Sequence, residues 1–237
     1  TVVRPRAEVL LAEQRAAMLK DPNFVAERSL YVVMKDWGQE SEFILGVWAF
    51  AIIGYKSWHA RRERALLARD LVHVPEGMKI LPEDTREYAR PLEALPPEEA
   101  ECLMPRALLV ALYRFGATRN LQDVSDAARG VCQSEADRLD SELSMLRYIA
   151  WAIPAIGFIG TVRGIGDALG QAHRAVSGDV SGVTEGLGTA FNSTLVALLI
   201  SIVLMFLLHQ LQLAQERRVL DTETYLDRYL IRHMQVR

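Results

Sequence analysis

The stretch from residue 186 to residue 215 contains no Asp, Glu, Lys or Arg, and its central part, 195–208, reads LVALLISIVLMFLL. About 20 consecutive apolar residues are enough for a helix to cross the hydrocarbon layer of a membrane. Every backbone group must be hydrogen-bonded within such a segment, because an unsatisfied group in lipid costs several kcal/mol. The stretch therefore predicts a membrane-spanning helix, which we place at residues 185–210.

Two further spans are predicted upstream, at residues 147–171 and 42–58. Residues 148–162 read YIAWAIPAIGFIGTV without a charge, and residues 43–55 read FILGVWAFAIIGY between two charged residues. The earliest apolar run is short, but the aromatic residues along it and a lysine able to extend to the headgroups favour a span. The expected fold is an all-α integral membrane protein with three transmembrane helices.

Basic residues close to the spans predict their orientation, because cytoplasmic loops carry an excess of Lys and Arg. Arginines follow the first span directly, stand at the start of the second and follow the third. This pattern places the N-terminus outside and the C-terminus in the cytoplasm. The remaining parts are then an N-terminal extracytoplasmic segment, 1–41, a cytoplasmic helical region, 59–146, a short extracytoplasmic loop, 172–184, and a cytoplasmic C-terminal helix, 211–237.

The cytoplasmic part is expected to be helical and continuous with the last two spans. Residues 75–105 are rich in proline and acidic residues, which predicts a loop with short helical turns. Apolar residues then return at helical spacing, and no proline lies between residue 105 and Arg147, so one long helix should run into the second span. The apolar positions are Leu108, Leu112, Phe115, Val124, Ala128, Val131, Ala136, Leu139, Leu143 and Leu146, and after the third span Leu213, Val219, Leu220, Leu226, Leu230 and Ile231.

Composition argues against several classes of function. The formal net charge is -3 and no basic stripe is present, so no nucleic-acid partner is expected. Cys102 and Cys132 lie far apart without a metal-binding pattern and are expected to be free thiols in a reducing compartment. The five histidines are scattered and no catalytic motif occurs. The chain is therefore not expected to be an enzyme, to bind a metal ion or to hold a cofactor.

The second and third spans each carry a stripe of small residues at helical spacing. Helices in lipid approach one another through small residues, since the backbones can then come close. The residues expected at this contact are Pro154, Gly157, Gly160 and Gly164 in the second span and Ala190 and Ala197 in the third. A proline inside a helix removes a hydrogen bond, so Pro154 is also expected to kink its span.

Each stripe also contains hydroxyl groups, of which Thr161 and Thr194 are the most prominent. They are consistent with tight packing alone, or with a polar path in which hydroxyls donate to and accept from a chain of waters. No carboxylate lies in the middle of a predicted span. If protons cross the membrane, the titrating group is therefore expected on a partner helix.

Residues 154–165, with the GTVxG core at Gly160–Gly164, resemble the MotA/TolQ/ExbB proton channel family. Residues 185–197 (EGLGTAFNSTLVA), leading into the last span, resemble the same family. The order of the three spans, the large cytoplasmic part and the long last helices also agree. The resemblance covers residues 43–234, whereas residues 1–42 match nothing in the family.

The resemblance implies a proton-conducting stator subunit of an ion-driven motor in the bacterial inner membrane, which converts proton motive force into mechanical work. A homopentamer would surround two copies of an ExbD-, TolR- or MotB-like partner, whose single spanning helix carries the proton-carrying Asp. A non-conducting oligomeric membrane scaffold is the alternative. The resemblance does not say which machine is driven or whether the ion is H⁺ or Na⁺, although no obvious cation cage is present.

The pore-facing threonines of the family correspond to Thr161 and, with a spacing one helical turn longer, to Thr194. Because of that spacing, the same role could fall to one of three nearby residues, Ser193, Asn192 or Thr189. Glu185 matches an acidic position at the start of the family's last span, but an acid is also favoured there by the helix macrodipole.

Arg163 departs from the family pattern, because it occupies the variable position of the GTVxG core, where an aromatic or apolar residue is common. Its charge is expected either to pair with Asp167, four residues on, or to reach the lipid headgroups. A role for Arg163 in conduction is not expected.

Overall fold

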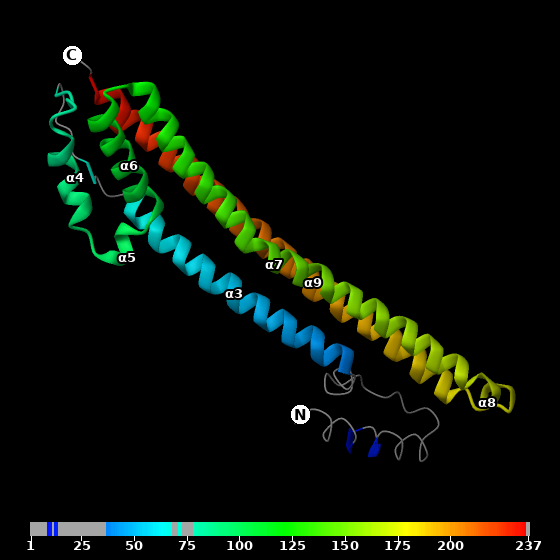
Figure 1. Cartoon of the computed structure of the whole chain (residues 1–237). Coiled ribbons are helices and arrows are strands. Elements are labelled where there is room, and N and C mark those ends of the chain that lie inside the picture. Colours follow the sequence, from blue (N-terminus) through cyan, green and yellow to red (C-terminus); the bar gives the residue numbers. More distant parts are fainter. Residues whose placement is uncertain (1–8, 11, 14–36, 68–70, 73–77, 236–237) are drawn as a thin grey trace. The chain divides into compact units, whose positions relative to one another are not determined.

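The computed structural model describes residues 9–10, 12–13, 37–67, 71–72 and 78–235, which are almost entirely helical (Figure 1). Most of the predicted N-terminal segment, 1–41, lies outside the described residues. The helices are α3 (Trp37–Leu67), α4 (Thr85–Glu93), α5 (Pro97–Ala100), α6 (Leu103–Thr118), α7 (Leu121–Gly170), α8 (Ala172–Val176) and α9 (Ser181–Tyr225). A π-helical turn, Leu226–Leu230, and a 3₁₀ turn, Ile231–His233, follow α9.

The chain divides into two compact units. The first unit consists of Thr1–Ile52 and Leu146–Leu207, and the second unit consists of Ile53–Met145 and Leu208–Arg237. Helices α3, α7 and α9 each contribute residues to both units.

Helices α7 and α9 are long and continuous, as the sequence predicted. They contain 50 and 45 residues. At a rise of about 1.5 Å per residue, α7 is about 75 Å long, more than twice the thickness of the hydrocarbon layer. Each helix must therefore extend well beyond any membrane that it crosses.

Two described segments, Leu121–Gly170 and Ser181–His233, are long and apolar enough to cross a membrane. Only 28% of the most apolar part of each is buried, whereas the core helix of a soluble protein is mostly buried. Large apolar side chains are instead exposed along both helices, among them Phe158, Ile159, Val162, Leu195, Ile202 and Phe206. This exposure is what a lipid-facing surface requires. Helix α3, which contains the predicted first span, does not pass the same test of length and hydropathy.

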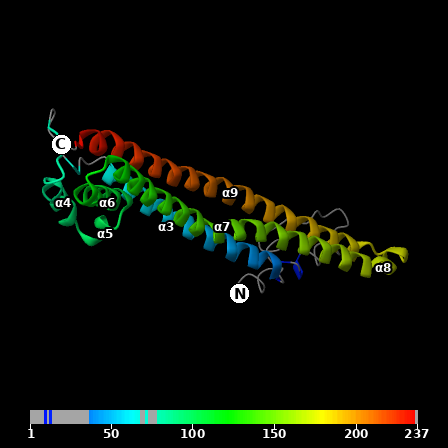
Figure 2. The same cartoon turned by 45° about the horizontal axis from the view of Figure 1, so that its top comes forward.

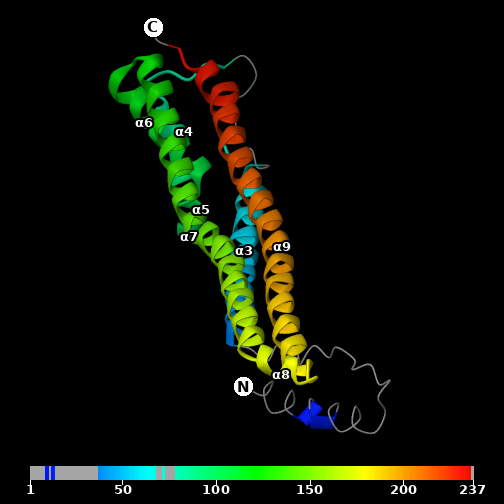
Figure 3. The same cartoon turned by 90° about the vertical axis from the view of Figure 1, so that its right-hand side faces the viewer.

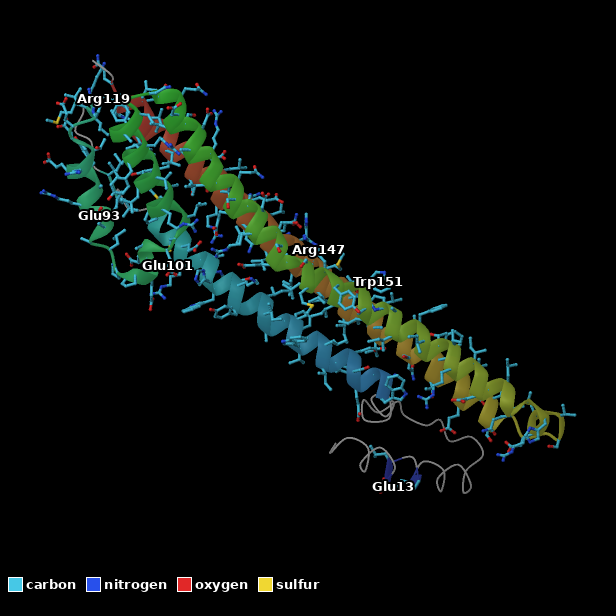
Figure 4. The ribbon with its side chains drawn as sticks, in the orientation of Figure 1. Glu13, Glu93, Glu101, Arg119, Arg147 and Trp151 are labelled. Carbon is cyan, nitrogen blue, oxygen red and sulfur yellow. The ribbon has the colours of Figure 1, made fainter. Side chains whose placement is uncertain are left out.

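The apolar half of α7 begins with a basic residue followed by aromatic ones. Arg147 and Trp151 lie one turn apart on this helix (Figure 4). Trp151 is 70% exposed, and Tyr148 beside it is also exposed. Aromatic rings of this kind are enriched where a membrane helix meets the headgroups.

Helix α7 remains helical through Pro154. Proline has no N–H, so the carbonyl of Ala150, one turn earlier, lacks its usual helical donor. The hydroxyl of Ser201 on α9 donates to this carbonyl at 3.1 Å. A buried side chain of the neighbouring helix thus satisfies the group that the proline leaves open.

Replacing Ser201 by alanine is expected to destabilise the first unit by about 1 kcal/mol, because the Ala150 carbonyl would then be buried without a donor. The loss should appear as a lower thermal midpoint of the purified protein in detergent. Ser144→Ala on α7 is the control, since the exposed Ser144 hydroxyl donates to the Ser141 carbonyl of its own helix. Equal midpoints for the two variants would contradict the role assigned to Ser201.

The second unit has an apolar core between α4, α6 and the ends of α7 and α9. Figure 2 shows α4, α5 and α6 grouped together. Leu108, Leu112, Phe115 and Val124 are fully buried, as their spacing predicted. Of the two adjacent apolar positions, Val219 is buried and Leu220 is 60% exposed, because adjacent positions on a helix point in different directions.

The proline-rich stretch contains the short helices α4 and α5, in agreement with the predicted helical turns. Glu93, Glu101 and Arg119 lie at the C-terminal ends of α4, α5 and α6 (Figure 4). Arg119 adopts a left-handed conformation with φ of 53°, which ends α6. The side chain of Asn120 then accepts a hydrogen bond from the backbone N–H of Gln122 at 3.0 Å and caps the start of α7.

The C-terminal end of the described chain is tied to the start of the proline-rich stretch. The backbone N–H of Ile80 donates to the His233 carbonyl at 2.7 Å, and the Ile80 carbonyl accepts from Gln235 at 3.0 Å.

Both cysteines are free and buried in the second unit. Burial raises the pKa of the Cys132 thiol to about 11 and raises that of Cys102 as well. Both thiols are therefore protonated at neutral pH and react slowly while the unit is folded.

Candidate functional site

Within the first unit, α7 and α9 lie side by side (Figures 1 and 3) and touch through their small residues. A Cβ atom added to Gly157 would collide with Ala197, and one added to Gly160 would collide with Ser193. At Gly164 an added Cβ would lie 2.8 Å from the Ala190 Cβ and from two backbone atoms of α9. The absence of side chains at these glycines is what lets the two backbones approach.

The hydroxyls of Thr161 and Thr194 meet across this contact. Thr161 Oγ1 lies 3.2 Å from the Gly157 carbonyl and 3.3 Å from the Ala190 carbonyl, and Thr194 Oγ1 lies 3.2 Å from the Gly157 carbonyl. Each hydroxyl has one proton to donate, so the pair has more acceptors than protons. The two side chains can therefore exchange hydrogen-bond partners without separating the helices.

Ser193 lies on another face of the same turn of α9 and points toward α3. Its hydroxyl donates to the Glu42 carboxyl at 3.4 Å, and both side chains are buried. Sequence reasoning had placed Glu42 at the edge of the first span and no carboxylate further in. The structure shows that α3 already begins at Trp37, so Glu42 lies within this helix and is buried in the bundle.

A signal for Glu42 was present in the sequence. Gln39, Glu42, Gly46 and Ala49 follow helical spacing and form the buried stripe of α3 in the first unit. A Cβ added to Gly46 would lie 3.0 Å from Ile200 of α9, so this stripe faces α9. An acid in line with small, buried residues marks a carboxyl directed toward another helix.

The other predicted residues lie outside this polar contact. Asn192 and Thr189 are half-buried, and Glu185 is exposed near the start of α9. Arg163 and Asp167 are both exposed and form no ion pair with each other among the described residues. The expected pairing of Arg163 with Asp167 is therefore not formed.

The start of α9 is fixed by a short turn after α8, four residues earlier than the span boundary at 185. Gly178 has φ of 96°, a conformation that side chains rarely adopt. Asp179 then accepts hydrogen bonds from the Ser181 hydroxyl and from the Ser181 backbone N–H at 3.1 Å. These bonds lower the pKa of Asp179, so it is a charged N-terminal cap.

The second unit contains a separate cluster of charges. A cavity of about 150 Å³ is lined by Tyr55, Lys56, His59, Ala60, Glu63, Glu135, Arg138, Leu139, Glu142, Gln215 and Arg218. Burial alone would raise the pKa of Glu142, but the Lys56 ammonium 2.6 Å away outweighs burial and lowers it. Arg218 pairs with Glu63, and both are largely buried. This cluster joins the three long helices by ion pairs, and no metal-binding group of His, Cys, Asp or Glu occurs among the described residues.

The family model of the MotA/TolQ/ExbB proton channel family matches residues 103–224, a range that includes the glycine contact and both threonines. No curated protein and no solved structure matches the chain. The family is one of membrane channels rather than enzymes, and its match covers about half of the sequence. The chain belongs to the MotA/TolQ/ExbB proton channel family.

Proposed function

We propose that the chain is the proton-conducting stator subunit of an ion-driven rotary motor. Five copies surround two copies of an ExbD-, TolR- or MotB-like partner, whose single spanning helix carries an Asp. Protons pass between the pentamer and this Asp, and the partner dimer turns within the ring. The output is mechanical work on another part of the cell envelope or surface.

The observation that carries this proposal is the paired hydroxyls of Thr161 and Thr194 in two helices that are apolar enough to span a membrane. Hydroxyls can donate hydrogen bonds to water or to a partner carboxyl, and accept them, without placing a permanent charge in lipid. Glycines bring the two hydroxyls together, and membership in a proton channel family supports a conducting role for this arrangement.

The driving force is adequate for small steps. One proton crossing a potential of 100 mV releases about 2.3 kcal/mol. That free energy can bias one step of a rotation, whereas a large rearrangement would need several protons. A mechanism of repeated small steps therefore suits the proposed motor better than a single large conformational change.

The proposed topology has three spans in the bacterial inner membrane, with the N-terminus outside and the C-terminus in the cytoplasm. The first span lies within α3, which packs against α9 at Gly46. The exposed Arg61 and Arg62 after this span support a cytoplasmic second unit.

Thr161→Val is expected to reduce proton uptake to the level of empty liposomes while leaving assembly intact, because valine has the same shape without the hydroxyl. The measurement is dye-reported uptake by liposomes carrying this chain and its single-span partner under an imposed potential. Thr184→Val is the matched control, since the exposed Thr184 hydroxyl bonds to the carbonyls of Val180 and Ser181 in its own segment. Undiminished uptake by the Thr161 variant would show that the Thr161 hydroxyl is not part of the conducting path.

A non-conducting scaffold is the second candidate, and one observation favours it. Both threonine hydroxyls also lie within hydrogen-bond distance of backbone carbonyls of the two helices, which is what purely structural threonines do. A scaffold predicts no uptake by the unaltered protein and no co-purifying partner with an acidic spanning helix. The same liposome measurement on the unaltered protein separates the two functions.

A further inference from the structure

Glu42 is the most deeply buried acid among the described residues of the first unit. Its side chain is 0% exposed, and Ser193 is 3% exposed beside it. The Glu42 Oε1 atom accepts a hydrogen bond from the Ser193 hydroxyl at 3.4 Å. The Oε2 atom is also buried and has no hydrogen-bond partner among the residues that the structure describes.

A carboxyl in this position is unusual for a residue with a purely structural role. Burying an isolated ionised carboxylate is very unfavourable, so structural carboxylates in protein interiors are paired with cations or fully hydrogen-bonded. Glu42 forms no ion pair with any residue that the structure describes, and one weak hydrogen bond satisfies only one of its oxygens. An ionisable group kept under these conditions within a membrane bundle points to a functional role.

The groups that face Glu42 leave it without a fixed partner. From α9 it meets the Ser193 hydroxyl, and on α3 its buried neighbour one turn earlier is the neutral Gln39. The charged residues of α7 and α9 in the first unit are Arg147, Arg163, Asp167 and Glu185.

Glu42 is also close to the proposed path. Ser193, which contacts Glu42, lies against Gly160, where any side chain would collide with the Ser193 hydroxyl. The next residue, Thr194, contacts Thr161. One turn of α9 therefore presents a hydroxyl to the acid on one side and a hydroxyl to the threonine pair on the other.

We propose that Glu42 is a proton-binding site of the conduction path, supplied by this chain itself in addition to the acid of the partner. A hydronium ion in the path gives a proton to the Glu42 carboxylate at Oε2, which leaves water and the neutral acid. The neutral acid later returns that proton to another water, which becomes hydronium. The Ser193 hydroxyl donates to Oε1 and stabilises the charged form between these events. This inference rests on the proposed function, because it assigns a step within the same proton path.

Glu42→Gln is expected to lower the initial rate of proton uptake about 100-fold, the order of effect of removing a positioned proton-transfer group. The complex of this chain with its single-span partner would be measured in liposomes, with assembly checked by size-exclusion chromatography. Glutamine keeps the shape and polarity of the side chain but cannot titrate. Glu40→Gln, on the same helix two residues earlier, is the matched control and should leave the rate unchanged.

A second measurement tests proton binding independently of conduction. Infrared difference spectra of the purified complex between low and high pH should contain the carbonyl stretch of a buried protonated carboxyl. This band should be absent from Glu42→Gln and shifted in Ser193→Ala, which keeps the acid but removes its hydroxyl partner. The Ser193 variant and the unaltered protein keep the test decisive even if the glutamine variant does not assemble.

The outcomes separate the inference from the function on which it rests. An unaltered protein that conducts, with an assembled Glu42→Gln variant that conducts equally, overturns the role of Glu42 and leaves the channel intact. An unaltered protein that does not conduct overturns the proposed function, and with it the step assigned to Glu42. A pH-difference spectrum without a band sensitive to Ser193 overturns proton binding at Glu42.

Discussion

Replacing Gly164 by valine is expected to prevent the close packing of α7 and α9. A Cβ at Gly164 would lie 2.8 Å from the Ala190 Cβ, the Ala190 backbone nitrogen and the Gly186 carbonyl oxygen. Two of these three atoms are backbone, so no side-chain rotation can relieve the clash. Overpacking usually costs about 1–3 kcal/mol, and a clash with backbone should reach or exceed the upper end of this range.

The measurement is the yield of assembled protein by size-exclusion chromatography in detergent, together with its thermal midpoint. Gly166→Val is a closely matched control, because Gly166 lies two residues away on α7 and an added Cβ meets nothing within 4 Å. The control should assemble like the unaltered chain. If both variants assembled equally well, the contact between α7 and α9 would be looser than the described geometry.

Breaking the pair between Glu63 and Arg218 is expected to have the second large effect. Their side chains are 13% and 7% exposed, and burial lowers the pKa of the Arg218 guanidinium. Burial therefore makes the charged form of Arg218 less favourable, and Glu63 supplies the compensating negative charge. Removing one partner of a buried ion pair destabilises a protein by about 3–5 kcal/mol, because the other charge stays buried without compensation.

Glu63→Gln should therefore lower the denaturant midpoint of the purified protein strongly. The double variant Glu63→Gln with Arg218→Met should be less destabilised than Glu63→Gln alone, because no unpaired charge remains. Arg217→Gln is the control, since Arg217 is the exposed neighbour of Arg218. If the double variant were less stable than Glu63→Gln alone, the loss of stability would come mainly from the interaction between Glu63 and Arg218 and not from the unpaired charge.

Local patterns in the sequence were sufficient to predict the long helices. A charge-free apolar stretch and unbroken helical spacing depend only on neighbouring residues, and α7 and α9 are continuous as they predicted. The same spacing predicted the core of the second unit, including Leu112, Phe115 and Val124. Leu220 belongs to the same apolar pattern but is exposed, because two adjacent residues cannot both lie on the buried face of a helix.

The candidate site was predictable only in part. The stripes containing Thr161 and Thr194 identified the two faces that meet, but three neighbouring residues remained possible in place of Thr194. In the structure Thr194 faces α7 and Ser193 faces α3, because successive residues of a helix point about 100° apart. The first span and the cytoplasmic location of the second unit remain predictions.

Composition and periodicity alone thus determined that the chain is helical, that two helices are apolar enough for a membrane and that small residues line one face of each. The tertiary structure decided which residues meet across those faces, above all Glu42 and Ser193, which are 151 positions apart. The physical reason is that helix formation depends on residues within one or two turns. The register between distant helices is set by how their side chains fit, down to the missing atoms of a glycine.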